Sequence, residues 1–453
     1  MKDSGADDTI AAVATPAGAG AIAIIRISGP SAVESAARIV RLRTGTLATA
    51  PAQTMRRATV VDPEHGELID EAFCSVMRAP RSSTGEDVVE ISCHGSPVVL
   101  RRVLGMLRAA GVRLAEPGEF TRRAYLNGRL DLVQAEAVAA LITARTERAA
   151  ALAARNLAGG LSDRVEAIRE RVLDMVAGLE VALDFPDEQV GLGPVDAVKL
   201  VTALVEEVTR LLAAVRDGRL IYDGLTAVIV GAPNAGKSSL LNRLVESDRA
   251  IVSPIPGTTR DLIEGSLTID GISIRLVDTA GLSATGDPIE AEGMRRTRRA
   301  AQESDLVLMV IDGHCLQTNS VDPLEAGGNT LLVVNKSDLE QDPSLSDVPG
   351  IRVSALTGEG IDLLLAAMKA WIEDRLVSDA DEAGLVASLR QIEALEALRG
   401  ALARAEAALL GDTPLEAALV DLRDALRLAG SVVGTDVPEL VLDRIFSTFC
   451  IGK

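Results

Sequence analysis

Aromatic side chains are scarce in this chain of 453 residues, which has one tryptophan, two tyrosines and five phenylalanines. Positive charge is also in short supply, because 46 lysines and arginines face 65 aspartates and glutamates, for a formal net charge of −19. This excess of negative charge opposes electrostatic binding of nucleic acid over a broad surface, and the low aromatic content leaves few side chains on which bases could stack. Any contact with RNA must therefore be local or helped by a partner.

Cysteines are few and show no C-x-x-C spacing, which fits reduced thiols better than a disulfide framework or a zinc site. They are Cys74, Cys93, Cys315 and Cys450. The acidic N-terminus lacks the pattern of a signal peptide, and no apolar run approaches membrane-spanning length. We therefore expect a cytoplasmic protein without a membrane segment. Its length and its 47% hydrophobic content predict two or three domains.

Five short motifs stand between residues 231 and 356 in the order that a GTP-binding protein needs: GAPNAGKS, PGTTRD, DTAG, NKSD and SAL. In the first motif the glycines let backbone N–H groups surround phosphate oxygens, Lys237 reaches the β- and γ-phosphates, and Ser238 offers a hydroxyl to Mg²⁺. A strand-like run over 225–230 precedes it, and a helix that opens at Ser239 follows, with its positive N-terminus facing the anion. This context is typical of a phosphate-binding loop.

The later motifs indicate Mg²⁺ and guanine. Asp278 follows a strand-like run over 273–277, and its carboxylate is placed near Mg²⁺. Asp338 can accept from the N1–H and the exocyclic amine of guanine, a donor pair that adenine lacks, and a backbone N–H of 354–356 can meet guanine O6. The predicted GTP-binding residues are Asn234, Ala235, Gly236, Lys237, Ser238, Ser239, Ser253, Thr258, Thr259, Asp278, Thr279, Ala280, Gly281, Asn335, Lys336, Asp338, Ser354, Ala355 and Leu356.

One position departs from Ras-type proteins. Leu282 follows DTAG, where Ras has the glutamine that orients the attacking water. The residues leave two interpretations open: the domain hydrolyses GTP poorly, or another group positions the water. Glu290 is a candidate for that group, although an ordinary solvated loop carboxylate is the alternative interpretation.

The flanks of the GTPase segment predict two further domains. Residues 1–125 alternate strand-like runs with turns and include a helical stretch over 98–110, which favours an α+β domain. Helical periodicity follows over 126–222 and returns over 377–453, where Thr413 and Glu416 suggest a capping box. If these helices pack on each other, a Ras-like GTPase domain over 223–376 is inserted into a discontinuous helical domain. Two separate helical modules, or helices that mainly dimerise, remain alternatives.

With these pieces assembled, the chain resembles the MnmE (TrmE) family of tRNA-modification GTPases along its whole length. The motifs that carry the resemblance run from Asp8-Thr-Ile10 to the terminal Cys450-Ile-Gly-Lys453. Between them stand Ala14-Thr-Pro16, Ile25-Arg-Ile-Ser-Gly29, Thr84-Gly-Glu-Asp-Val-Val-Glu90, Cys93-His-Gly95, Pro117-Gly-Glu-Phe-Thr121, the stretch 127–136 and Pro256-Gly-Thr-Thr-Arg-Asp261.

The resemblance implies a cytoplasmic homodimer that joins an MnmG-like FAD protein in a heterotetramer or larger complex and acts on tRNA. The family adds an aminomethyl or carboxymethylaminomethyl group to the wobble uridine, U34, with a one-carbon unit from 5,10-methylenetetrahydrofolate, for which 5-formyltetrahydrofolate is an analogue. The N-terminal domain would then bind folate and dimerise. Two other functions stay open: a ribosome-assembly GTPase switch, and a folate-dependent aminomethyl-transfer protein whose nucleotide domain is a clamp.

The resemblance also assigns residues. It implies that folate is bound by Arg26, Glu90, Arg129 and Lys453. Cys450 lies in the same C-terminal tail as Lys453. Many family members have lysine at position 129, so an arginine contact there should be bidentate. Potassium would replace an arginine finger, and its ligands would be Asn234, Ser253, Ile255 and Thr258. Thr259 matches the second Mg²⁺ ligand beside Ser238, and Glu290 matches the glutamate that orients water. The predicted catalytic residues are then Glu290, Lys237 and Asn234.

Overall fold

The computed structural model describes residues 8–185, 191–247, 264–278, 299–315, 329–346, 348–376, 384–411, 413–435 and 437–453. The chain divides into two compact units, each discontinuous in sequence: residues 1–139, 157–201 and 400–453 form the first unit, and residues 140–156 and 202–399 form the second. Among the described helices, none combines the length and the apolarity that a membrane crossing requires.

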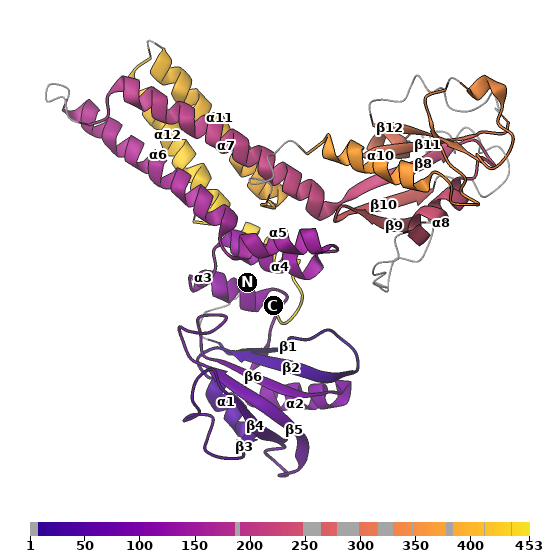
Figure 1. Cartoon of the computed structure of the whole chain (residues 1–453). Coiled ribbons are helices and arrows are strands. Elements are labelled where there is room, and N and C mark those ends of the chain that lie inside the picture. The colour runs from indigo at the N-terminus through magenta and orange to yellow at the C-terminus, as the bar shows by residue number, and fades with distance from the viewer. Residues whose placement is uncertain are drawn as a thin grey trace. The chain divides into compact units, whose positions relative to one another are not determined.

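A seven-stranded sheet forms the N-terminal part of the first unit (Figure 1). All neighbouring strands are antiparallel except the β1–β7 pair, which is parallel. This confirms the predicted α+β class for this region. In spatial order the strands are β3 (Val40–Leu42), β4 (Met55–Val61), β5 (Leu68–Met77), β6 (Val88–Gly95), β2 (Gly20–Ser28), β1 (Ile10–Val13) and β7 (Arg113–Leu114).

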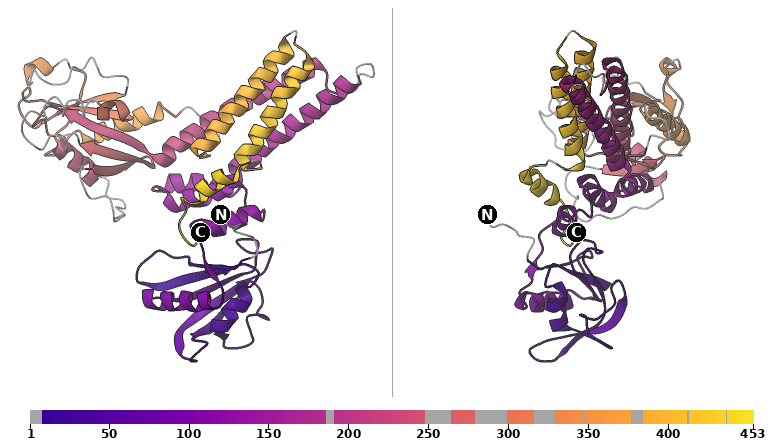
Figure 2. Two further views of the ribbon diagram at one scale, coloured as in Figure 1. Left: turned by 180° about the vertical axis from the view of Figure 1, so that it is seen from behind. Right: turned by 90° about the vertical axis from the view of Figure 1, so that its left-hand side faces the viewer.

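The two faces of this sheet differ because successive side chains of a strand point to opposite sides. In β5, Ala72, Cys74 and Val76 are buried, whereas Glu71 and Phe73 are exposed. Helices α1 (Ala32–Ile39) and α2 (Pro97–Ala109) cover the buried face and share its apolar core (Figures 1 and 2). The opposite face carries Ile22, Met55 and Phe73, which are 68%, 67% and 50% exposed.

Helices complete the first unit. The long helix α6 (Gly160–Asp184) packs along α12 (Leu415–Val433), and the Arg423 guanidinium lies 2.6 Å from the Glu180 carboxylate (Figure 2). A helix from before the GTPase segment therefore pairs with one from after it. Two shorter helices, α3 (Glu119–Leu126) and α13 (Glu439–Phe446), also contact each other. The predicted capping box is wrong: α12 has no side-chain cap, and the Thr413 hydroxyl donates to the Ala408 carbonyl at 2.7 Å.

The second unit contains a six-stranded sheet that is parallel except for the pairing of β9 with β10. In spatial order its strands are β13 (Ile351–Arg352), β12 (Thr330–Asn335), β11 (Leu306–Asp312), β8 (Leu225–Gly231), β10 (Ile272–Asp278) and β9 (Glu264–Ile269). The helices α8 (Lys237–Ser247) and α10 (Ile361–Glu373) pack on its core, to which α5 (Glu147–Leu157) and α7 (Pro194–Asp223) also contribute. Helices α4 (Leu132–Thr143) and α11 (Leu389–Leu410), like α5 and α7, contribute residues to both units.

Parallel strands bring their carboxyl ends to one edge, where α/β proteins bind ligands. Here β8 ends at Gly231, β10 at Asp278, β11 at Asp312 and β12 at Asn335, so the first, third and fourth sequence motifs converge there. The predicted α/β GTPase fold is confirmed.

Candidate functional sites

The phosphate-binding loop joins β8 to α8 through two residues in the left-handed region, Asn234 at φ 64° and Gly236 at φ 92°. A Cβ atom on Gly236 would lie 2.2 Å from the side-chain nitrogen of Asn335. Glycine is therefore required at position 236 both by its backbone angle and by its close neighbour.

Lys237 and Ser238 open α8 at this loop. Lys237 is 8% exposed, and its ammonium donates to the carbonyls of Gly231 at 3.0 Å and Ala232 at 2.9 Å. Burial lowers its pKa, and the attraction of Asp278 opposes that shift. The Ser238 hydroxyl donates to the fully buried Asp278 carboxylate at 2.6 Å. A hydroxyl and a carboxylate oxygen side by side fit the oxygen ligands that Mg²⁺ prefers.

Asn335 joins the phosphate loop to the loop predicted to read guanine. Its side-chain N–H donates to the Ala235 carbonyl at 2.8 Å, and its side-chain oxygen accepts from the Ala355 N–H at 3.0 Å. The next residue, Lys336, has φ 66° and pairs with Asp312 at 2.6 Å. Asn335 therefore links two loops that are predicted to bind opposite ends of a nucleotide.

Asp338 and the 354–356 loop form the other end of this site. The fully buried Ser354 donates its hydroxyl to the Asp338 carboxylate at 2.6 Å and accepts from the Thr357 N–H at 3.0 Å. Asp338 itself is exposed, as is Leu356. The arrangement holds an acceptor carboxylate open to a purine edge while fixing its direction.

The second group of predicted residues lies on the exposed face of the N-terminal sheet. Strand register places Met55, Ser75, Glu90 and Arg26 opposite one another in a single row across β4, β5, β6 and β2. The Arg26 guanidinium contacts the Glu90 carboxylate through two nitrogens, each at 2.8 Å, and lies 5.7 Å from the centre of the Phe120 ring. This row places Arg26 and Glu90 on one face.

Arg129 borders a cavity at the other end of that row. The cavity has a volume of about 630 Å³ and is lined by Gln53, Met55, Ser75, Met77, Arg81, Ser82, Ser83 and Arg129. Arg129 donates to the Ser82 carbonyl at 3.2 Å. Gly85 permits this approach, because it has φ 82° and a Cβ there would lie 2.8 Å from Asn127. The row of Met55, Ser75, Glu90 and Arg26 therefore begins at this cavity and ends at the ion pair of Arg26 with Glu90.

The C-terminal tail of the same chain reaches this face. Arg26 donates to the Gly452 carbonyl at 3.4 Å, and the Phe120 N–H donates to the Lys453 carbonyl at 3.2 Å. Gly452 has φ 92°, and a Cβ there would lie 2.4 Å from the Val13 carbonyl oxygen. The end of the chain is therefore docked against β1 and β2, with Cys450 exposed.

Two models of known protein families match this chain. A family model described as "MnmE helical domain" matches residues 132–450, and one described as "GTP-binding protein TrmE N-terminus" matches residues 9–129. Proteins described as "tRNA modification GTPase MnmE" are similar along the whole chain. The Symbiobacterium thermophilum protein is 46% identical and the Moorella thermoacetica protein 45%, with 99% of this chain and 100% of each relative covered. A protein from Thermus thermophilus is 45% identical, with coverages of 98% and 99%.

The chain belongs to the MnmE family of tRNA modification GTPases.

Several predicted site residues lie outside the described parts of the chain: Ser253, Ile255, Thr258, Thr259, Thr279, Ala280, Gly281 and Glu290. The second Mg²⁺ ligand and the water-orienting glutamate therefore stay predictions, as do all the potassium ligands, Asn234 included. Of the residues described, Asn234 and Ser239 are exposed at the loop and on α8.

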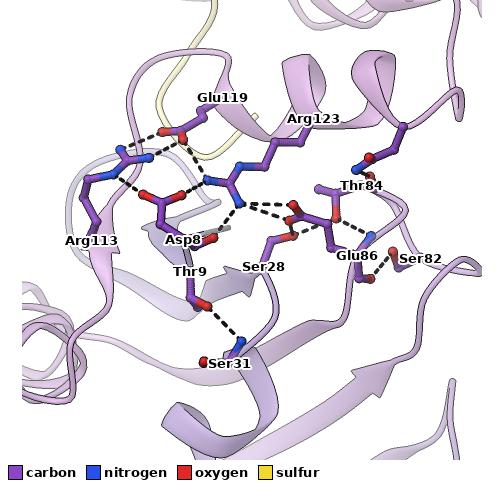
Figure 3. Close-up of polar contacts among 11 residues, drawn as sticks. Asp8, Thr9, Ser28, Ser31, Ser82, Thr84, Glu86, Arg113, Glu119 and Arg123 are labelled. Atoms are coloured by element: carbon purple, nitrogen blue, oxygen red, sulfur yellow. Dashed lines mark hydrogen bonds and ion pairs between the residues drawn. The ribbon is translucent and has the colours of Figure 1, made fainter. Parts of the chain in front are cut away.

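Sequence reasoning missed a cluster of charges at the end of the sheet where β1, β6 and β7 begin (Figure 3). Arg123 pairs with Asp8, Glu86 and Glu119, and Arg113 pairs with Asp8 and Glu119. Burial alone would raise the pKa of Glu119, but the Arg113 guanidinium and a backbone N–H bring it below its ordinary value. These charges come from Asp8, the 84–87 loop, β7 and α3, so spacing gives no signal for them.

This cluster fixes the loop that leads into β6 and its Glu90. The Glu86 carboxylate accepts from the Ser28 hydroxyl at 2.7 Å, and Ser28 also shares a 2.7 Å hydrogen bond with Thr84 (Figure 3). Asn127 donates to the Thr84 carbonyl at 2.8 Å. The cluster is therefore a support for the row of Arg26 and Glu90.

Proposed function

We propose that this chain is a potassium-activated GTP hydrolase that acts with an MnmG-like flavoprotein to modify the wobble uridine of tRNA. The family membership is the main support for the proposal. The relatives are described as tRNA modification GTPases, and the similarity to this chain extends over almost their entire length. The nucleotide loops support it independently, because phosphate-binding and guanine-reading groups converge at one edge of a single sheet.

Each part of GTP has a matching group in the second unit. The N–H groups of the 231–238 loop and Lys237 suit the phosphates, because the ammonium already lies against carbonyls of that loop. Asp338, held by Ser354, suits the N1–H and amine of guanine. Asn335 ties these ends together. A site of this kind orients the γ-phosphate for attack by water.

Two cations complete the proposed chemistry. Mg²⁺ and K⁺, when bound, neutralise negative charge that develops on the phosphates during hydrolysis. Ser238 and Asp278 would hold Mg²⁺, directly or through water, since their oxygens lie 2.6 Å apart; Thr259 would be the second direct ligand. Asn234 would hold K⁺ together with Ser253, Ile255 and Thr258. Glu290 would orient the water, in place of the glutamine absent after DTAG.

The exposed sheet face suits a folate. Its cavity, of about 630 Å³, falls within the usual range for small-molecule sites, and it combines apolar side chains with Arg129 and serines. Arg26 and Glu90 continue the same row and offer charged partners to polar groups. We propose that this face binds 5,10-methylenetetrahydrofolate, which supplies a one-carbon unit, with Lys453 and Cys450 nearby.

Cys450 differs from the two cysteines in the sheet. Burial raises the pKa of Cys74 to about 12 and that of Cys93 to about 11, so both stay protonated at neutral pH. Cys450 is exposed in the docked tail. If a thiol takes part in the modification, Cys450 is our candidate.

A homodimer and a cytoplasmic complex with the flavoprotein and tRNA complete the proposal. Ile22, Met55 and Phe73 are large apolar side chains exposed on the same sheet face, and apolar side chains of this kind suit association between two copies. The net charge of −19 opposes binding of tRNA over a broad surface, so contact with tRNA must be local or helped by a partner.

The deciding experiment is mass spectrometry of wobble nucleosides in tRNA from a strain that lacks this protein. We expect the modified uridine to disappear and to return when the wild-type gene is restored, but not when Asp338→Ala is restored. Unchanged wobble nucleosides in the deletion strain would overturn the proposal. Accumulation of ribosome precursors with normal tRNA would favour a ribosome-assembly switch instead.

A further inference from the structure

We propose that Arg243 positions the 354–356 loop so that the Leu356 N–H selects the O6 atom of guanine. Arg243 lies on α8, and its Nε donates to the Ala355 carbonyl at 3.0 Å while a terminal nitrogen donates to the Leu356 carbonyl at 2.5 Å. The inference rests on the proposed binding of GTP and adds a specificity residue that lies outside the five motifs.

Peptide geometry turns these carbonyl contacts into control of the N–H groups. In a planar trans peptide the C=O and the N–H point in opposite directions. The Ala355 carbonyl shares its plane with the Leu356 N–H. By holding that carbonyl toward α8, Arg243 directs the Leu356 N–H away from α8, and the second bond fixes the next peptide plane in the same way.

The tip of this loop needs such a restraint. Ser354 is already restrained without Arg243, since its N–H donates to the Glu359 carbonyl at 2.9 Å and its hydroxyl binds Asp338. Leu356 is 77% exposed, so its side chain packs little against the domain. The carbonyl contacts from Arg243 therefore restrain the part of the loop where packing is weakest.

An arginine suits this task better than a lysine would. The guanidinium presents several N–H donors in a rigid plane, which can reach two neighbouring carbonyls at once. The only acidic group near it in the described residues is Glu246, at 4.0 Å, which is the limit for an ion pair. The guanidinium's short contacts are thus with the loop carbonyls, not with a carboxylate.

The position of Arg243 on α8 also connects the two ends of the nucleotide site. Lys237 and Ser238 stand in the first turn of the helix, at the phosphate loop, and Arg243 follows about 9 Å further along the axis. One rigid helix therefore carries groups for the phosphates and the restraint on the base-reading loop. Asn335 makes a second link between these loops.

The test compares nucleotides that differ at single positions of the base. The full-length protein is titrated with GDP, with 6-thio-GDP, whose sulfur is a weak acceptor in place of O6, and with IDP, which keeps O6 but lacks the amine. In wild type we expect GDP to bind about tenfold tighter than 6-thio-GDP, the scale of one hydrogen bond. In Arg243→Ala this preference should fall to about twofold or less, because the direction of the Leu356 N–H is no longer fixed.

The preference for GDP over IDP should survive in Arg243→Ala, since Asp338 reads the amine. Arg352→Ala is the matched control, because Arg352 also donates to two backbone carbonyls, those of Leu345 and Ser346, in a loop without a predicted nucleotide role. It should keep both preferences. If Arg243→Ala folds poorly, Arg243→Gln retains one donor group and should show an intermediate preference for GDP over 6-thio-GDP.

An unchanged preference for GDP over 6-thio-GDP in either Arg243 variant would overturn the inference, even if both nucleotides bound more weakly. An equal loss in Arg352→Ala would overturn it too, since general loosening of the domain would then explain the effect. Failure of wild type to bind GDP at all would instead reject the proposed function.

Discussion

The two candidate sites are assembled in opposite ways. The nucleotide site takes contiguous motifs from the ends of parallel strands, and its polar groups bond mainly to one another, as Asn335 does with Ala235 and Ala355. The sheet site takes one residue from each of several antiparallel strands and a carbonyl from Gly452, 426 residues beyond Arg26. Spacing along the chain therefore specifies the first site, whereas strand register specifies the second.

This difference between the two sites also predicts that each binds its ligand independently of the other. No residue of the described nucleotide loops belongs to the first compact unit, and no residue of the sheet row belongs to the second. Changes in one site should leave ligand affinity at the other unaltered in the absence of a partner. Coupling between hydrolysis and modification would then arise in the assembled complex.

Replacement of Glu290 should have the largest effect. We expect Glu290→Ala to slow single-turnover GTP hydrolysis by about 100-fold, the usual scale for a lost general base or water-orienting group, while GTP affinity stays within about threefold. Folate affinity should not change. Nucleotide titration and quenched-flow assays separate binding from chemistry, and an unaltered single-turnover rate would return Glu290 to the class of solvated loop carboxylates.

Exchange of potassium for sodium should have the next largest effect. At equal ionic strength we expect turnover by the isolated protein to fall about tenfold or more, because Leu282 supplies no water-orienting amide and Asn234 is the proposed potassium ligand. The rate should also rise with protein concentration if two GTPase domains must associate. Steady-state assays in the two salts check this, and equal rates would exclude potassium activation.

Local patterns predicted the elements that position the nucleotide site. The strand-like runs before GAPNAGKS and DTAG became β8 and β10, since a buried strand is followed directly by its functional loop. The helical stretch over 98–110 became α2. In each case the signal and the structure lie within about ten residues of each other along the chain.

Contacts between distant segments escaped the same reasoning. Thr413 fits a capping motif, yet its hydroxyl binds the preceding helix instead. Arg123 meets Asp8, 115 residues away, and no spacing rule links them. The tail also docks on Arg26, where a frayed chain end is the usual expectation. Tertiary packing decided each of these outcomes.

Charge reversal on the sheet face tests the folate proposal. We expect Arg26→Glu to weaken binding of 5-formyltetrahydrofolate by about 10- to 100-fold, as a charged hydrogen bond is lost and repulsion with Glu90 is added. GTP hydrolysis should be unchanged. Isothermal titration calorimetry gives the affinity, with folding checked by circular dichroism.

Arg57→Glu is the matched control on the same sheet. Arg57 pairs with Glu71 in an exposed contact on β4 and β5, and neither residue is among those that line the cavity. It should keep wild-type folate affinity within about twofold. Equal affinities for wild type and a folded Arg26→Glu protein would show that the folate does not use this row.

The smallest effect concerns the charges that support the sheet site. The Glu119 side chain is 11% exposed and receives Arg113 and Arg123, which hold its pKa below the ordinary value although burial alone would raise it. Its contribution to stability is therefore complete above the unfolded-state pKa, near pH 4.3, and is lost as the pH falls through the lower folded-state pKa.

We expect Glu119→Gln to lower the free energy of unfolding of the first unit by about 2 kcal/mol at pH 7. The loss should shrink below about pH 4, because unfolded wild type is then protonated at this position and folded wild type follows at still lower pH. Glu71→Gln, in the exposed pair with Arg57, should cost about 0.5 kcal/mol or less at either pH. Thermal unfolding of both variants across this pH range measures these differences. A deficit for Glu119→Gln that stays constant down to pH 3.5 would mean that shape, not charge, fixes the loop leading to Glu90.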